Sequence, residues 1–244
     1  MEPTPFNDAG ALLRILLGAT GGGIDQLFDL SRLPRRMMEF EKKYRLSTTQ
    51  IPADLAISGF LSNLNQFFTQ SKMEIVSLAT FVGIDQYFIV NNEASEYIFR
   101  YRLGANRLPQ LTVKFQMNKG SNIARGEINL DVRYEEPDKV RAFIAVISSL
   151  VPKTTLFTIQ QSGNIWNIKE PDGDLVEFVV YKVDRITAPS KIEAFAEIEP
   201  LGSNKASDYT RTVDIIHTIE TYEKKLGLSS LVCEQSIAEI FRPE

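Results

Sequence analysis

Carboxylates and a lysine alternate near the start of the chain, and carboxylates alternate again near its end. Glu39, Glu41 and Lys43 are spaced two apart, as are Glu197 and Glu199. On a β-strand, residues two apart share a face and lie about 6.6–6.8 Å apart. Two carboxylates at that distance repel by about 2–2.5 kcal/mol at an effective dielectric of about 20. If these strands turn the charged face inward, the spacing therefore calls for a cation.

The donor types point to a hard metal ion. Four carboxylates from two strands can build an oxygen site that suits Mg²⁺ or Mn²⁺. The sequence contains no Cys/His cluster, so zinc is not expected. The single histidine, His217, lies in a predicted helix, where we expect a surface residue rather than a ligand.

Basic residues with the same alternation occur on the strands between these ends: Lys43, Arg100, Arg102, Lys114 and Arg125. Guanidinium groups fit phosphate oxygens in two-point contacts, and lysine adds a compact charge. One E-x-E-x-K strand alone is usually the solvated face of an antiparallel sheet. The joint pattern over five strands instead predicts a polyanion cavity in which a metal and the cations polarise a phosphoanhydride.

The elements that would position these residues are mostly short strands. Alternation predicts strands at 37–46, 73–82, 84–91, 96–103, 110–118, 123–134, 153–161, 164–169, 175–185 and 191–200. Apolar spacing predicts helices at 51–69, from Pro137 to Leu150, at 205–226 and at 236–241. Short connections favour antiparallel pairing, and a long sheet tends to close. We therefore expect an α+β fold: a closed antiparallel eight-stranded β-barrel, or tunnel, with helices packed outside.

Composition limits the class of protein. The chain has 244 residues, 43% of them hydrophobic, and a formal net charge of −4. We expect an N-terminal extension at 1–36 and one domain at 37–244. The acidic balance does not favour general nucleic-acid binding, and no run reaches the roughly 18 apolar residues of a membrane span. The single cysteine, Cys233, excludes an internal disulfide and suits a reducing, cytoplasmic location.

These motifs resemble those of the CYTH superfamily, the triphosphate tunnel metalloenzymes, which include thiamine triphosphatases, inorganic tripolyphosphatases and class IV adenylyl cyclases. Fungal and viral RNA triphosphatases are more distant members. The matching segments are Glu39-Phe40-Glu41-Lys42-Lys43, Arg100-Tyr101-Arg102, Thr112-Val113-Lys114, Arg125-Gly126-Glu127 and Phe195-Ala196-Glu197-Ile198-Glu199. The tail from Gly227 to Phe241 is similar to the family's C-terminal ending, and the resemblance covers 38–242.

The resemblance implies roles for these residues. One or two Mg²⁺ or Mn²⁺ ions would be bound by Glu39, Glu41, Glu127, Glu197 and Glu199. The triphosphate would be bound by Lys43, Arg100, Arg102, Lys114 and Arg125, with Glu41 and Lys43 serving catalysis. The implied activity is metal-dependent hydrolysis of tripolyphosphate, a nucleoside triphosphate or thiamine triphosphate.

The sequence departs from the family pattern at two places. The strand 157–161 ends in Gln160 and Gln161 where the family has a basic pair, and Tyr181 stands near the position of a family aspartate. Asp184 differs from Tyr181 by three, so it would face outward.

These departures leave two alternatives open. The first is a catalytically weak protein that binds a triphosphate or nucleotide; the second, less favoured, is synthesis of cyclic AMP from ATP. The expected partner is a small triphosphate or nucleotide, with RNA only through a 5′-triphosphate end. The oligomeric state is left open.

Overall fold

A computed structural model of the chain describes residues 38–91, 96–104, 110–116, 124–131, 154–170, 173–186, 190–201 and 209–243. The strands are β1 (Met38–Phe40), β2 (Lys42–Arg45), β3 (Glu74–Asn91), β4 (Glu96–Gly104), β5 (Gln110–Gln116), β6 (Ala124–Asp131), β7 (Thr154–Lys169), β8 (Leu175–Arg185) and β9 (Ile192–Leu201). The helices are α2 (Ala53–Ser71), α4 (Tyr209–Lys225), a 3₁₀ turn η4 (Ser229–Leu231) and α5 (Ile237–Phe241). In these stretches, no helix combines the length and apolarity of a membrane span.

All nine strands form one sheet in the order β1-β6-β5-β4-β3-β7-β8-β9-β2. Every strand pair in it is antiparallel, so the expected α+β class with an antiparallel sheet is confirmed. The sheet differs from the closed eight-stranded barrel expected, because Glu41 divides the predicted strand 37–46 in two. β1 then pairs with β6 and β2 pairs with β9, so the two ends of the strand order are consecutive in the chain.

Two of the predicted strand boundaries were wrong. Residues 73–91 and 153–169 were each expected to form two strands, but β3 and β7 are each continuous. The predicted break between 73–82 and 84–91 falls at Gly83, but Gly83 lies within β3, paired with Gly104 on one side and Gln161 on the other. The predicted extension 1–36 and the helix from Pro137 to Leu150 lie outside the described residues.

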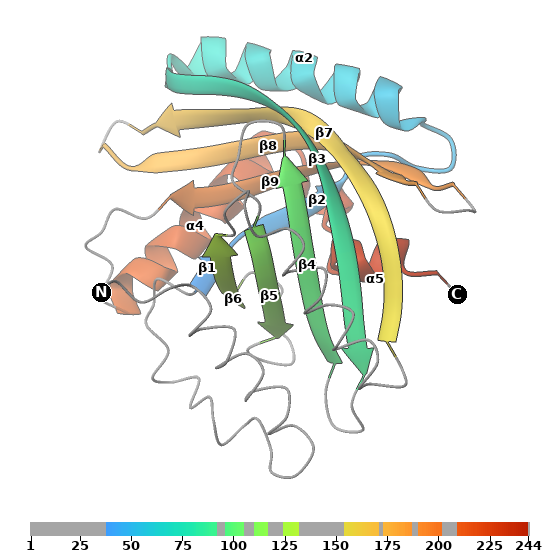
Figure 1. The fold of residues 1–244 in the computed structure, drawn as a ribbon. Coiled ribbons are helices and arrows are strands. Elements are labelled where there is room, and N and C mark those ends of the chain that lie inside the picture. The colour runs from blue at the N-terminus through green and yellow to red at the C-terminus, as the bar shows by residue number, and fades with distance from the viewer. Residues whose placement is uncertain are drawn as a thin grey trace.

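Two apolar layers hold the helices on opposite faces of β8 and β9. On one face, α2 packs through Phe60, Leu64 and Phe68 against strand residues such as Phe178, and α4 joins them through Ile219 and Tyr222. On the other face, α5 packs through Ile237, Ala238, Ile240 and Phe241 against residues of β3, β7, β8 and β9. We call these the outer and the inner face. In Figure 1 the sheet curves around α5, while α2 crosses above it.

The end of α5 is held by cations. Arg185 Nη1 donates to the carbonyl of Phe241 at 3.1 Å, and Lys191 Nζ donates to that of Ile240 at 2.8 Å. Glu193, only 5% exposed, makes ion pairs with Arg45 and Lys191. Positive charge at a helix C-terminus complements its free carbonyls. These contacts fix α5 against one part of the inner face.

Candidate functional site

The strand register gathers the charged residues on the inner face. Directly opposed residues of an antiparallel pair point to the same side of the sheet. Lys43 opposes Glu197 between β2 and β9, and Tyr181 of β8 lies opposite Phe195 of β9. Farther along the sheet, Asp85 of β3 opposes Arg102 of β4. By this register, cations and carboxylates from β2, β3, β4 and β9 share one face.

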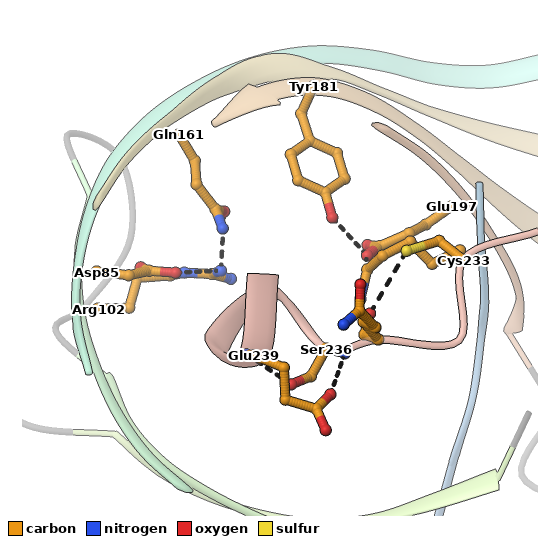
Figure 2. Close-up of polar contacts among 10 residues, drawn as sticks. Asp85, Arg102, Gln161, Tyr181, Glu197, Cys233, Ser236 and Glu239 are labelled. Carbon is orange, nitrogen blue, oxygen red and sulfur yellow. Dashed lines mark hydrogen bonds and ion pairs between the residues drawn. The ribbon is translucent and has the colours of Figure 1, made fainter. Parts of the chain in front are cut away.

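The first group on this face is a buried carboxylate that holds an arginine. Asp85 is fully buried and accepts two hydrogen bonds of 2.9 Å, from Nε and Nη2 of Arg102. Arg102 Nη2 also donates to Gln161 Oε1 at 3.1 Å (Figure 2). Burial and nearby Arg100 oppose the charge on Arg102, but Asp85 outweighs them, so the pKa of Arg102 lies above its usual value. The guanidinium is therefore charged and fixed in orientation.

The second group surrounds Glu197. Tyr181 donates its hydroxyl hydrogen to Glu197 Oε1 at 2.6 Å, and Lys43 Nζ lies 3.6 Å from the same oxygen (Figure 2 draws the tyrosine contact). Lys43 is only 4% exposed. Burial raises the pKa of Tyr181 well above its usual value, and the negative charges of Glu197 and Glu41 raise it further. Tyr181 is therefore a neutral phenol that donates its hydrogen bond to Glu197.

Tyr87 lies on the same face of the sheet as both groups. It lies opposite Arg100 in the sheet, and it influences the pKa values of both Arg102 and Tyr181. Arg100, 8% exposed, donates from Nη2 to Thr112 Oγ1 at 3.1 Å. By register, the charged residues of β2, β4 and β9 therefore lie on one face of the sheet, and Lys43 and Arg100 are buried there.

Six of the ten predicted site residues have described side chains: Glu41, Lys43, Arg100, Arg102, Glu197 and Glu199. Glu41 is buried between β1 and β2, and Glu199 is half-buried opposite Glu177. For the other four, the structure describes only the backbone. Its register places Glu39 opposite Arg125 and Lys114 opposite Glu127. These pairings bring acidic and basic positions of β1, β5 and β6 into register.

The carboxylate donors suit a hard divalent cation in type, but the described side chains alone do not assemble a site for one. Among them, no group of three or more His, Cys, Asp or Glu residues is placed to hold a metal ion. Glu197 Oε1 is already engaged by Tyr181 and Lys43. Any metal would therefore also need donors from Glu39 or Glu127, whose side chains are not described.

The two departures from the family pattern take definite positions. Tyr181 contacts Glu197 on the inner face, whereas Gln160 is exposed and its neighbour Gln161 reaches Arg102. Lys182 binds Asp54 of α2 with an Nζ–Oδ1 distance of 3.0 Å, and hence lies on the outer face. Asp184, two residues further on, shares that face, as expected. Neither of these two charges lies on the inner face.

Asp85 and Gln161 were missed by the sequence reasoning. The signal for Asp85 was present, because it is the lone acid in an apolar alternating run. The predicted break at Gly83 separates Asp85 from the first half of β3 and hides that both halves belong to one strand. Gln161 was noted only as a missing base, not as a partner of Arg102.

A glycine makes room for Tyr181. Gly163 of β7 lies opposite Tyr181 of β8. A Cβ atom at Gly163 would lie 2.3 Å from the carbonyl oxygen of Val180 and 2.6 Å from Cβ of Tyr181. Both are closer than atoms pack, and both neighbours are fixed near the backbone. A glycine at this strand position is therefore required by the close approach of the β8 backbone at Val180 and Tyr181.

Comparisons with known proteins give no family assignment. No family model matches the chain, and no curated protein does. Among solved structures, the chain is similar to the Pct1 RNA triphosphatase of S. pombe, with 11% identity, a TM-score of 0.37 and 96% of each chain covered. The same enzyme in complex with the Spt5 CTD gives the same identity and TM-score over 82% of this chain and 87% of that one. Likenesses this weak carry no argument about the activity of this chain.

Proposed function

We propose that the inner face binds a triphosphate chain and cleaves one of its phosphoanhydride bonds with the help of Mg²⁺ or Mn²⁺. The observation that carries the proposal is the convergence of three buried or half-buried cations, Lys43, Arg100 and Arg102, with Glu41 and Glu197 on one face. β1 and β2 are the two outermost strands of the sheet, yet they follow each other directly in the chain. This brings the two edges of the sheet close together and also supports an enclosed, tunnel-like site. Burial favours a polyanion, because charge interactions strengthen where water is excluded.

The cations have different tasks in this proposal. Arg102 keeps its orientation through Asp85 and presents its remaining N–H groups to phosphate oxygens. Lys43 stabilises the negative charge that develops on the terminal phosphoryl group, and Glu41 orients the attacking water. A divalent ion, held by Glu41, Glu197 and Glu199 with Glu39 and Glu127, would neutralise non-bridging oxygens. Lys114 and Arg125 would extend the phosphate contacts.

The test is release of inorganic phosphate from tripolyphosphate, ATP, GTP, thiamine triphosphate and 5′-triphosphate RNA, with Mg²⁺ and then with Mn²⁺. We expect turnover of at least one substrate that is lost in Glu41→Gln and Lys43→Ala. Lys182→Ala, on the outer face, is the matched lysine control and should keep full activity. No phosphate release from any of these substrates would reject hydrolysis.

A specific observation favours a second candidate, a protein that binds the triphosphate without turning it over. Tyr181 and Gln161 occupy the inner face where the related enzymes have an acid and a base, and the Tyr181 hydroxyl engages a carboxylate oxygen of Glu197. Calorimetric titration with tripolyphosphate separates the two. Binding that Lys43→Ala abolishes, with no phosphate released, would establish the binding protein, whereas hydrolysis lost in Glu41→Gln would exclude it.

A further inference from the structure

The first half of β3 is an open edge of the sheet. β7 pairs with β3 from Glu74 to Val90, but β4 begins to pair on the other side only at Gly83. In Figure 1, β3 continues beyond the tip of β4 towards α2. Within the described chain, no strand covers the edge from Glu74 to Val82. Every second N–H and C=O along it therefore faces away from β7.

The strand itself carries none of the residues that usually protect an open edge. Open edges in soluble proteins carry charges or prolines, or are kept short, because they can pair with other strands. From Ile75 to Ile84 there is no charged residue and no proline. Val76, Leu78 and Val82 are 52%, 60% and 52% exposed. A bulge between Ile75 and Ser77 is the one disruption, and it leaves a regular stretch at 77–82.

The regular stretch is complementary to a second copy of itself. If two copies pair antiparallel about a two-fold axis through Thr80, the outer-face residue Leu78 lies opposite Val82 of the other copy. On the inner face, Ala79 then lies opposite Phe81. No like charges meet in this register, whereas a charged peptide would find no countercharge on the strand. The uncharged, apolar character of the edge therefore favours a second copy over a charged partner.

We propose that the protein forms a homodimer by antiparallel pairing of this β3 edge, which makes one continuous sheet across the two copies. The outer-face side chains of β3 would then contact their equivalents from the other copy side by side. A ladder of about five residue pairs is short compared with a permanent interface, so the dimer is reversible and depends on concentration. The proposal does not depend on the triphosphate site.

The first test is the mass of the full-length protein in solution by sedimentation equilibrium between about 1 and 100 µM. We expect a monomer–dimer equilibrium whose dissociation constant rises about tenfold or more in Leu78→Lys. Leu156→Lys is the matched control, because Leu156 is 58% exposed on β7, paired with Phe88 far from Thr80. A monomer at every concentration, or equal effects of the two substitutions, would overturn the proposal.

The second test fixes the register. Residues opposed at a two-fold axis of an antiparallel pair have Cα atoms about 4.5–5.5 Å apart, within the range of about 4.4–6.8 Å that a disulfide spans. Thr80→Cys should therefore form a covalent dimer rapidly under mild oxidation. Ser62→Cys, an exposed site on α2, is the control, and native Cys233 is buried. Crosslinking of both variants at the same rate would contradict the register and the interface.

Discussion

At the scale of single residues, Asp85 is a buried charge that fixes the orientation of Arg102 on the inner face. Asp85→Asn removes the ionised partner of Arg102 from a fully buried position. Breaking such a pair costs about 3 kcal/mol, which for a chain of this size lowers Tm by about 6–12 °C. Thermal unfolding followed by circular dichroism measures the change.

Asp54→Asn is the matched control. Asp54 also binds a basic side chain, Lys182, but it is 81% exposed, and exposed pairs contribute about 0–1 kcal/mol. We expect almost no shift in Tm for this variant. Equal shifts for the two substitutions would show that burial of Asp85 has no energetic weight.

The raised pKa of Tyr181 leads to a prediction about stability and absorbance at alkaline pH. Its folded pKa is raised above the usual 10.0, so folding favours the neutral phenol. The stability from this preference is complete below about pH 10 and is lost as the pH rises above that value. Tyrosinate absorbance is measured at alkaline pH in the native protein and in Tyr181→Phe. The two folded proteins should show no difference near pH 10, and a difference should appear only on unfolding. A difference that titrates near pH 10 would contradict a buried, carboxylate-bound hydroxyl.

At the scale of elements, the close packing of β7 against β8 depends on Gly163 of β7. Gly163→Ala adds a Cβ that collides with backbone and Cβ atoms of β8. Overpacking of this kind costs about 1–3 kcal/mol. Gly59→Ala in α2 is the control, since nothing lies within 4 Å of its Cβ position, and alanine there should stabilise the helix by about 0.5–1 kcal/mol. Urea unfolding should show opposite signs for the two variants; the same sign would refute the packing argument.

The elements also show what can be predicted from the sequence. Alternation predicted that Lys43 and Glu197 point to the same side of the sheet, because a β-strand repeats its inward positions every second residue, and the register confirms this. Their roles in binding or catalysis stay predictions. Asp85 was missed, since a glycine inside a strand has the same local signal as one in a turn. The contact of Arg185 with the end of α5 joins residues 56 apart, and no local pattern encodes it. Tertiary contacts of this kind decide which face of the sheet a terminal helix covers.

At the scale of the whole molecule, α5 covers part of the inner face. Deletion of residues 236–244 would expose apolar side chains that pack in one core cluster with α5, among them Phe195, which is fully buried and contacts the ring of Phe241. We expect increased binding of the dye ANS and a lower Tm. Ser236→Ala, which removes only the helix cap, should cost about 1 kcal/mol without binding dye. Unchanged dye binding in the deletion variant would show that α5 does not cover these residues.

The division of the first strand at Glu41 has a consequence for synthesis on the ribosome. Lys42 of β2 pairs with Ile198 of β9, roughly 150 residues later in the chain. At about 5–20 residues per second, β2 waits roughly 8–30 s for its partner to be made. Although β2 is made early, it is therefore among the last strands to form its hydrogen bonds. Until β9 emerges, the unpaired β2 can pair with a wrong strand.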